Sequence, residues 1–526
     1  MNLIEDAWLP VLREEGPDKI APWQIVETTN PVLEIAGPRP DFQGALYQFL
    51  IGVLQSCFAP DDHDEWLEYW HEMPMVEDLK SRFEKASSAF ELENSDGPAF
   101  LQDFNLKAGE GKTIAGLLIE SPGGKTIKDN LDHFIKGGKI KKACPSCAAT
   151  ALFTLQTNAP AGGVGHRVGL RGGGPLTTLV LPGDEASLWK KLWLNVLDRG
   201  WFDASAVEVK ADIFPWMGPT RISDKGGKNT TPEDVAPLQM YWGMPRRIRM
   251  DFVVAEESRC DLCGDNTTCF VENYRTQNYG TNYEGAWVHP LTPYRFDPKK
   301  EKPPLSLKGQ QGGLGYRHWL GVTMTDQASG DCAAKVVQAY MEERVHNLPG
   351  EALARLWCFG YDMDNMKARC WYDHEMPLLK LDAAQRENLL HWVKELVAAA
   401  TDVSGFLRSQ LKEAWFKRTK DVKGDMNAVV TEFWQQSEQD FYVLLKCFSD
   451  LSGEQRLAPP EIYKFWEKTI RNLALDLFDS WVLECPAEDA DMKRIIGARK
   501  ELEKNLRTSK AMKNLREKST AKKEGK

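Results

Sequence analysis

Two cysteine pairs with the same spacing are the residues of this sequence best suited to chemistry. Cys144-Pro-Ser-Cys147 and Cys260-Asp-Leu-Cys263 each place two thiols on one tight turn. Two such turns supply the four thiolates that hold zinc in a tetrahedron at about 2.3 Å, and Gly264 gives the second turn a permissive backbone. Because four cysteines leave no open coordination position, we expect a structural zinc site that joins two segments far apart in the sequence.

Two other interpretations of these cysteines stay open. Cys144 precedes an apolar stretch that could be helical, as in thioredoxin-like motifs, so the pairs could be redox-active thiols. They could also be thiols without a ligand. The total of 11 cysteines is odd, and the N-terminus has no export signal, so a disulfide framework is not expected.

A glycine-rich stretch is the second feature with chemical content. Seven of the thirteen residues from Gly162 to Gly174 are glycine. The stretch fails the dinucleotide-binding fingerprint, because Val168 stands where a third glycine is required after Gly163 and Gly165. Such a loop can bring bare backbone against a surface that side chains would hold away, for example a narrow minor groove. A plain mobile loop is the alternative interpretation.

Residues 122–143 combine six lysines with four glycines and only two aspartates, which is typical of a flexible basic loop. The loop could make about six phosphate contacts at most, and binding through it would weaken steeply with salt. Its lysines are Lys125, Lys128, Lys136, Lys139, Lys141 and Lys142.

The elements that must position these residues divide the chain in two. Residues 1–380 have a mixed α/β pattern, with a helix from Asp41 to about Cys57 and a strand near residues 176–181. After residue 381 the apolar periodicity is helical, in four segments that begin near Leu381 and then cover about 426–448, 460–484 and 488–516. We therefore expect an α+β protein: a mixed α/β domain (1–380) with a zinc-stapled segment, then a C-terminal four-helix bundle (381–526) with a basic tail.

The charge balance limits the partners of the chain. Its 526 residues carry 66 Lys and Arg against 76 Asp and Glu, a net charge of −10, although the last twenty residues are basic. A chain this acidic is a poor free-standing nucleic-acid binder, so nucleic acid must meet local basic loops or arrive on a partner. No apolar run reaches the roughly 18 residues of a membrane span, and we expect a cytoplasmic protein without membrane contact.

Several segments together resemble one family. They are the opening Met1–Val11, Cys144-Pro-Ser-Cys147, Gly169-Leu-Arg-Gly-Gly173, Trp287-Val-His-Pro290 and Gly360-Tyr-Asp-Met-Asp-Asn-Met-Lys-Ala-Arg-Cys-Trp371. In this order they resemble the large subunit (CasA) of Cascade, the type I-E CRISPR surveillance complex. The resemblance spans residues 1 to about 375. The helical remainder agrees with the family's C-terminal four-helix bundle in pattern only.

The resemblance implies a non-enzymatic role. The family's subunit recognises the protospacer-adjacent motif (PAM) in double-stranded DNA, helps to start unwinding toward the guide RNA, and provides a docking surface for the helicase–nuclease. Its partners would be the other Cascade subunits, the CRISPR guide RNA, target DNA with a PAM and that helicase–nuclease. The rival hypothesis is a zinc-dependent or thiol redox enzyme that uses the CxxC pairs, although the scattered histidines show no nucleophile–base arrangement.

The resemblance also implies site residues. The PAM loop that enters the minor groove would be Ala161, Gly162, Gly163, Val164 and Gly165. The family's base-contacting lysine falls near position 276, where this chain has Arg275 and Thr276. The wedge that enters the duplex falls at Asp364, Asn365 and Met366, with Asn365 the expected wedge. The basic loop 122–143 would face DNA near the first guide-paired bases.

Overall fold

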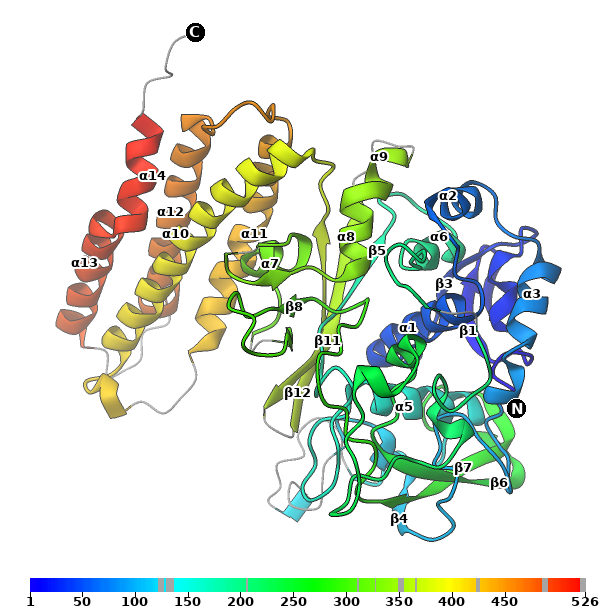
Figure 1. The fold of residues 1–526 in the computed structure, drawn as a ribbon. Helices are drawn as coiled ribbons and strands as arrows, with labels where there is room; N and C mark the ends of the chain where they lie inside the picture. The colour runs from blue at the N-terminus through cyan, green and yellow to red at the C-terminus, as the bar shows by residue number, and fades with distance from the viewer. Residues whose placement is uncertain are drawn as a thin grey trace. The chain divides into compact units, whose positions relative to one another are not determined.

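The structure is a computed structural model that describes residues 1–121, 127–128, 137–204, 207–309, 312–326, 328–348, 354–364, 367–421, 426–484 and 491–520 (Figure 1). The chain forms two compact units. The N-terminal unit contains Met1–Gly309 and Asp326–Glu375, and the C-terminal unit contains Gln310–Thr325 and Met376–Lys526. The helical unit therefore includes a segment well before the expected boundary at residue 381. Tyr316 explains this, because its ring stacks on Phe441 with centroids 4.3 Å apart.

The strands that the structure describes lie in the N-terminal unit, except for the last two residues of β12. They form four three-stranded sheets with the orders β2-β1-β3, β4-β7-β6, β10-β8-β9 and β12-β11-β5. The strands are β1 (Leu9–Arg13), β2 (Gly16–Ile20), β3 (Val32–Ile35), β4 (Glu110–Thr113), β5 (Thr177–Leu181), β6 (Arg247–Arg259), β7 (Asn266–Gln277), β8 (Tyr294–Arg295), β9 (Leu305–Ser306), β10 (Asp331–Cys332), β11 (Arg355–Asp364) and β12 (Lys367–Pro377).

The α-helices of the N-terminal unit are mostly short. They are α1 (Pro40–Cys57), α2 (His63–His71), α3 (Val76–Glu84), α5 (Pro145–Asn158), α6 (Leu188–Trp193), α8 (Lys335–Ala339) and α9 (Val345–Asn347), with a π-helical turn at Tyr340–Arg344 between the last two. The C-terminal unit contains α7 (Trp319–Thr323), α10 (Ala383–Trp415), α11 (Asn427–Ser449), α12 (Pro460–Val482), α13 (Met492–Thr508) and α14 (Lys510–Thr520). No helix in the described part of the chain has the length and apolar character needed to cross a membrane.

Helix α1 is the centre of the N-terminal core, and it confirms the helix expected from Asp41 to Cys57. Fifteen of its 18 residues are buried, because the helix is apolar on every side. Phe49 packs edge-on against five aromatic rings at centroid distances of 5.4–6.0 Å. The five rings belong to Trp8, Phe90, Phe100, Phe153 and Trp242.

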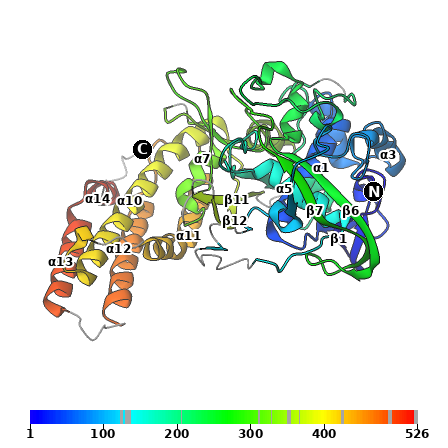
Figure 2. The same cartoon turned by 90° about the horizontal axis from the view of Figure 1, so that it is seen from below.

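Strands β6 and β7 form a long antiparallel pair that lies beside α5 (Figure 2). The two strands have 13 and 12 residues, and their pairing continues past two register shifts toward the second cysteine turn. Strand β4 pairs with the other edge of β7. The pair therefore carries the second cysteine turn at one end and residue 277 at the other.

The C-terminal unit is a bundle of long helices, which confirms the expected helical region. Helix α10 contacts α11, α12 and α13, and α12 contacts α11 and α14. The fourth predicted helix is broken, since Ser509 has extended backbone angles (φ −61°, ψ 146°) between α13 and α14. The basic tail is partly neutralised within the bundle, because Arg516 pairs with Glu467 at 3.2 Å and Lys518 pairs with Glu395.

Candidate metal centre and nucleic-acid interface

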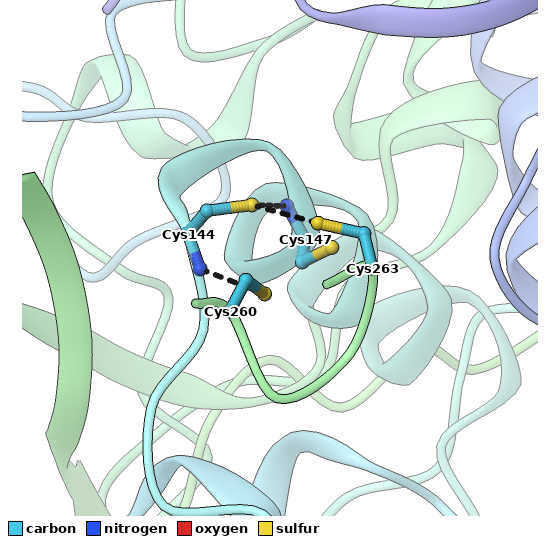
Figure 3. Close-up of side chains that lie close together, drawn as sticks. All are labelled: Cys144, Cys147, Cys260 and Cys263. Atoms are coloured by element: carbon cyan, nitrogen blue, oxygen red, sulfur yellow. Dashed lines mark hydrogen bonds between the residues drawn. The ribbon is translucent and has the colours of Figure 1, made fainter. Parts of the chain in front are cut away.

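The four cysteines of the two pairs converge on one point. Cys144 and Cys147 lie at the N-terminus of α5, and Cys260 and Cys263 lie on the turn between β6 and β7 (Figure 3). The Sγ atoms of Cys144 and Cys263 are 3.7 Å apart, and all four Sγ atoms lie within 4.8 Å of one another. A zinc–thiolate tetrahedron with bonds of about 2.3 Å has sulfur–sulfur edges of about 3.8 Å. The four thiols therefore fit a tetrahedral metal ion.

Backbone N–H groups around the cluster already point at the sulfurs. The N–H of Cys144 donates to Sγ of Cys260 at 3.2 Å, and those of Cys147 and Leu262 donate to sulfurs at 3.4 Å. Such donors stabilise thiolate charge and orient metal ligands. Gly264 closes the second turn with φ +82°, which is the permissive backbone that the sequence predicted for it.

The environment favours thiolates on the second pair. Hydrogen bonds from Cys144 and Cys147 hold the pKa of the Cys260 thiol far below its usual value. A hydrogen bond from Cys147 likewise lowers the pKa of Cys263, while the pKa of Cys147 itself is raised. Lys19 also lies near the cluster, where its Nζ pairs with Asp265, two residues after Cys263, at 2.6 Å. The lowered pKa values of the second pair favour binding of a cation, which would displace the remaining thiol protons.

This donor set has a clear chemical meaning. A metal ion held by all four sulfurs has no open position for a substrate or an activated water, so its role would be structural. The cluster also puts both pairs on one site, whereas a thioredoxin-like centre uses a single pair. The geometry therefore favours the structural zinc site over the zinc-dependent or redox enzyme.

The proposed PAM loop, Ala161–Gly165, leaves the end of α5 and is closed at its base. The N–H of Gly169 donates to the carbonyl of Ala159 at 2.9 Å. Gly163 and Gly165 have φ of +75° and +77°, a backbone region that glycine adopts without strain. Val164, the one large side chain in the loop, is 74% exposed. The loop thus presents the backbone of its glycines and the side chain of Val164 to the solvent.

Two residues that were not among the predicted site residues support this loop at Gly165. The N–H of Tyr279 donates to the carbonyl of Gly165 at 2.7 Å. A Cβ at Gly165 would lie 2.9 Å from Cβ of Asn278 and 3.0 Å from the Tyr279 nitrogen, so only glycine fits there. Tyr279 has φ +63°, which is uncommon for a residue with a side chain. The sequence feature that could have indicated these two residues is Asn278, because an asparagine directly after a strand is typical of a turn.

The structure gives the expected base-contacting residues other partners. Arg275 lies on β7, where its Nη2 is 2.8 Å from Asp251 and its Nη1 donates to the Lys107 carbonyl at 2.8 Å. Thr276 is buried and donates to the carbonyl of Arg247 at 2.8 Å. Both side chains are thus bonded within the protein, and the residues in contact with the PAM loop at Gly165 are Asn278 and Tyr279.

Close packing links the glycine stretch to the β11–β12 hairpin. A Cβ at Gly173 would lie 2.9 Å from Cα of Pro160, at the base of the PAM loop, and a Cβ at Gly174 would lie 2.6 Å from Cγ of Met363. Asp364 follows at the end of β11, exposed and 3.9 Å from Arg369. The other two expected wedge residues, Asn365 and Met366, lie outside the described residues. The PAM loop and the strand that leads to the wedge are thus neighbours in the fold.

The basic loop is described only in part. Lys125 and Lys136 lie outside the described residues, whereas Lys128, Lys139 and Lys141 are exposed. Lys142 has a structural role, because its Nζ donates to Ser258 at 2.7 Å and lies 4.8 Å from the centroid of the Phe270 ring. Lys142 is therefore set apart from the exposed lysines.

A comparison with protein families identifies the chain. The model described as CRISPR-associated protein Cse1 (CRISPR_cse1) matches residues 2–477. This chain belongs to the Cse1 family. The family that the sequence motifs predicted is thereby confirmed.

Solved structures share the fold of this Cse1-family chain. The crystal structure of CasA from Thermus thermophilus is 18% identical, with 97% of this chain and 100% of that chain covered and a TM-score of 0.68. The crystal structure of Cse1 from Acidimicrobium ferrooxidans is 15% identical, with 99% of each chain covered and a TM-score of 0.67. A chain of a CRISPR RNA-guided surveillance complex is 14% identical, with 97% of this chain and 99% of that chain covered and a TM-score of 0.68. Both units thus follow the CasA fold.

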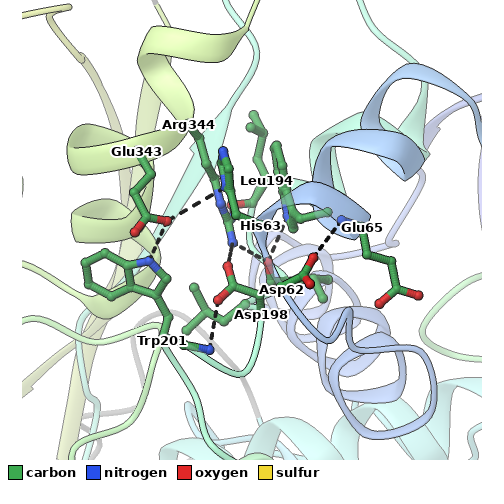
Figure 4. Close-up of polar contacts among 12 residues, drawn as sticks. Asp62, His63, Glu65, Leu194, Asp198, Trp201, Glu343 and Arg344 are labelled. Atoms are coloured by element: carbon green, nitrogen blue, oxygen red, sulfur yellow. Dashed lines mark hydrogen bonds and ion pairs between the residues drawn. The ribbon is translucent and has the colours of Figure 1, made fainter.

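A second group of possible metal ligands in the Cse1-family chain already contains a cation. His63, Asp198 and Glu343 offer ligand atoms within 4.8 Å of one another (Figure 4). The guanidinium of Arg344 is fully buried among them, 3.7 Å from Asp198 and 4.2 Å from the centroid of the Trp66 ring. A buried arginine of this kind neutralises the carboxylate that a metal would need. We interpret the group as a structural ion-pair network and not as an open catalytic site.

Proposed function

We propose that this chain is a non-catalytic subunit of an RNA-guided CRISPR surveillance complex of the Cascade type I-E class. In this role it recognises the PAM in double-stranded DNA through the minor groove, promotes unwinding and R-loop formation, and helps to recruit the helicase–nuclease. It acts in the cytoplasm together with the other Cascade subunits and the CRISPR guide RNA. Membership of the Cse1 family and the likeness to a chain of a surveillance complex support the assembly.

The single observation that carries PAM recognition is the bare backbone of the loop Ala161–Gly165. The minor groove of B-DNA is only about 6 Å wide and presents a degenerate pattern of base edges. A backbone with two glycines at positive φ can enter such a groove where side chains would not fit. Recognition through this groove would separate A·T from G·C pairs more than individual bases, so we expect several PAM sequences to be accepted.

The hairpin beside the loop supports the step from recognition to unwinding. Met363 packs against Gly174, so the strand that leads to Asn365 shares contacts with the glycine stretch. A side chain beyond this strand could therefore enter the duplex next to the base pairs that the loop reads. Such wedges unstack one base step at a cost of a few kcal/mol.

The charge of the chain supports a role inside an assembly. A net charge of −10 opposes independent binding to DNA. The complex would hold the chain in place, and the exposed lysines of the basic loop would then add local phosphate contacts.

Neutralising the exposed lysines is expected to weaken DNA binding irrespective of the PAM. The variant Lys128→Gln, Lys139→Gln, Lys141→Gln should flatten the slope of log affinity against log salt by about 0.9 for each phosphate that the loop no longer neutralises. Salt titrations of target binding by the assembled complex measure this. Lys142→Gln is the matched control, since Lys142 contacts Ser258 and Phe270. An equal slope change in the control would argue against the distinction between these lysines.

The proposed function is tested with the reconstituted complex and target duplexes whose flanking trinucleotide is randomised. We expect a small set of flanks to be enriched among the bound duplexes, and the enrichment to disappear when this chain is omitted from the assembly. Equal binding of all flanks, or unchanged enrichment without the chain, would refute PAM recognition by this subunit.

A further inference from the structure

Three arginines lie close together in the sequence at the start of β6, and only Arg247 has a carboxylate partner in the described part of the chain. Strand β6 begins at Arg247, directly after Arg246, and Arg249 follows two residues later. Arg247 pairs with the buried Asp103 at 2.5 Å, and Arg249 donates to the carbonyl of Gly97 at 3.2 Å. Arg246 has no carboxylate of this kind among the described residues.

The guanidinium of Arg246 lies next to Gly162 of the PAM loop. A Cβ at Gly162 would be 3.3 Å from Nη1 and 3.4 Å from Nη2 of Arg246. The Nη2 donates to the carbonyl of Pro160, which fixes the guanidinium against the base of the loop. Within the described part of the chain, Nε and Nη1 of Arg246 have no hydrogen-bond acceptor.

The electrostatic surroundings leave this cation without a counterion. Burial lowers the pKa of Arg246 to about 10, and the opposing influence comes from Tyr274 and not from a carboxylate. The group is nevertheless charged at pH 7. Burial and the charges of Arg246 and Lys112 lower the pKa of His166, so this neighbouring imidazole is neutral. A half-buried cation that lacks an acceptor is costly unless a ligand supplies one.

We infer that Arg246 is the phosphate-binding cation of the PAM loop, and that its Nη1 contacts a backbone phosphate of the DNA strand that the loop approaches. The inference rests on the proposed function. When backbone fills a minor groove, the groups at the rim of the groove are phosphates, and a guanidinium is well suited to them. A phosphate contact positions the duplex but carries no sequence information.

The chain offers a matched control in Arg167, which follows the same loop. Its Nε donates to Oγ of Ser223 at 2.8 Å, its Nη2 donates to the Ser223 carbonyl at 2.7 Å, and its guanidinium lies 5.9 Å from the centroid of the Tyr279 ring. Arg167 is therefore a loop arginine whose guanidinium is already occupied by protein.

The test compares reconstituted complexes that carry Arg246→Gln, Arg246→Lys or Arg167→Gln with the wild type. Target-duplex affinity is measured from low to high salt, and flank preference is measured with the randomised library. For Arg246→Gln we expect five- to tenfold weaker binding near 0.1 M salt, a log–log slope shallower by about 0.9, and an unchanged order of preferred flanks. Arg246→Lys keeps the positive charge, so its slope of log affinity against log salt should equal that of the wild type. Arg167→Gln should also have the wild-type slope.

The outcomes separate this inference from the proposed function. An unchanged salt slope in Arg246→Gln, or equally weakened binding in the glutamine and lysine variants without a slope change, would assign Arg246 a purely structural role and overturn the inference. An altered order of flanks would assign it to base contact and also overturn the inference. A wild-type complex that binds all flanks equally would instead refute the proposed function.

Discussion

Replacing Gly163 by valine is expected to abolish binding of target DNA while leaving assembly of the complex intact. Gly163 has φ +75°, and a Cβ there would meet no atom within 4 Å. Valine would therefore point into the open space that the duplex must occupy. Steric exclusion of the duplex by this side chain should lower the affinity about a hundredfold or more, which corresponds to a loss of at least about 2.7 kcal/mol. The backbone strain of a β-branched residue at this φ, about 1–3 kcal/mol, acts on the loop itself and is the part that a control variant must share. Target binding by the purified complex measures the loss of affinity.

A glycine of the same kind in the helical unit provides the control. Gly313 has φ +76° and a Cβ there would also meet nothing within 4 Å, so Gly313→Val carries the same strain in the other unit. We expect this variant to bind target DNA normally. Gly165→Ala tests the support of the loop, because its Cβ would press on Asn278 and Tyr279. PAM-dependent binding of normal strength by Gly163→Val would remove the minor-groove interpretation.

Replacing Cys147 by serine is expected to weaken metal binding and to destabilise the N-terminal unit strongly. The wild type should contain one zinc ion per chain, and Cys147→Ser clearly less, because the loss of one of four thiolates weakens zinc binding. Structural zinc contributes directly to folding. We expect the Tm to fall by on the order of 10 °C, which corresponds to a few kcal/mol. Elemental analysis and thermal unfolding provide the two measurements.

Two further observations sharpen this experiment. Cys370→Ser removes an exposed cysteine elsewhere in the same unit and should change neither zinc content nor Tm. Cobalt substituted into the wild type should show the intense charge-transfer absorption of several thiolate ligands. Substoichiometric zinc in protein purified without chelator, or full stability of Cys147→Ser, would contradict the structural metal site.

The sequence predicted most where local pattern decides the structure. The apolar residues on every side of 41–57 required a buried helix, and the spacing of the cysteines placed four sulfurs on one site although residues 148–259 separate the pairs. The predicted α+β fold with a helical C-terminal region is confirmed. The zinc ion, the PAM loop and the wedge stay predictions.

The sequence was less informative where tertiary pairing decides. The expectation that Arg275 contacts a base edge was made without knowledge of its cross-strand neighbours. Asp251 pairs with Asn273 across β6 and β7, which places its carboxylate diagonally opposite Arg275. Asn278 and Tyr279 were not predicted for the same reason, since only the tertiary fold brings the end of β7 into contact with Gly165. The break at Ser509 is also tertiary, because α14 then packs on α12.

The attachment of the basic loop to β7 has a consequence for its evolution. The chain leaves β7 at Thr113, which pairs with Asn273, and returns at Ala143, which pairs with Val271. The departure and return points are thus two residues apart on one strand, so the ends of the segment between them are fixed. Closing such a segment costs only about 0.6 kcal/mol more for each doubling of its length. Insertions and deletions that add or remove lysines here would therefore be nearly neutral for folding, and the segment can diverge in length and charge while the scaffold persists.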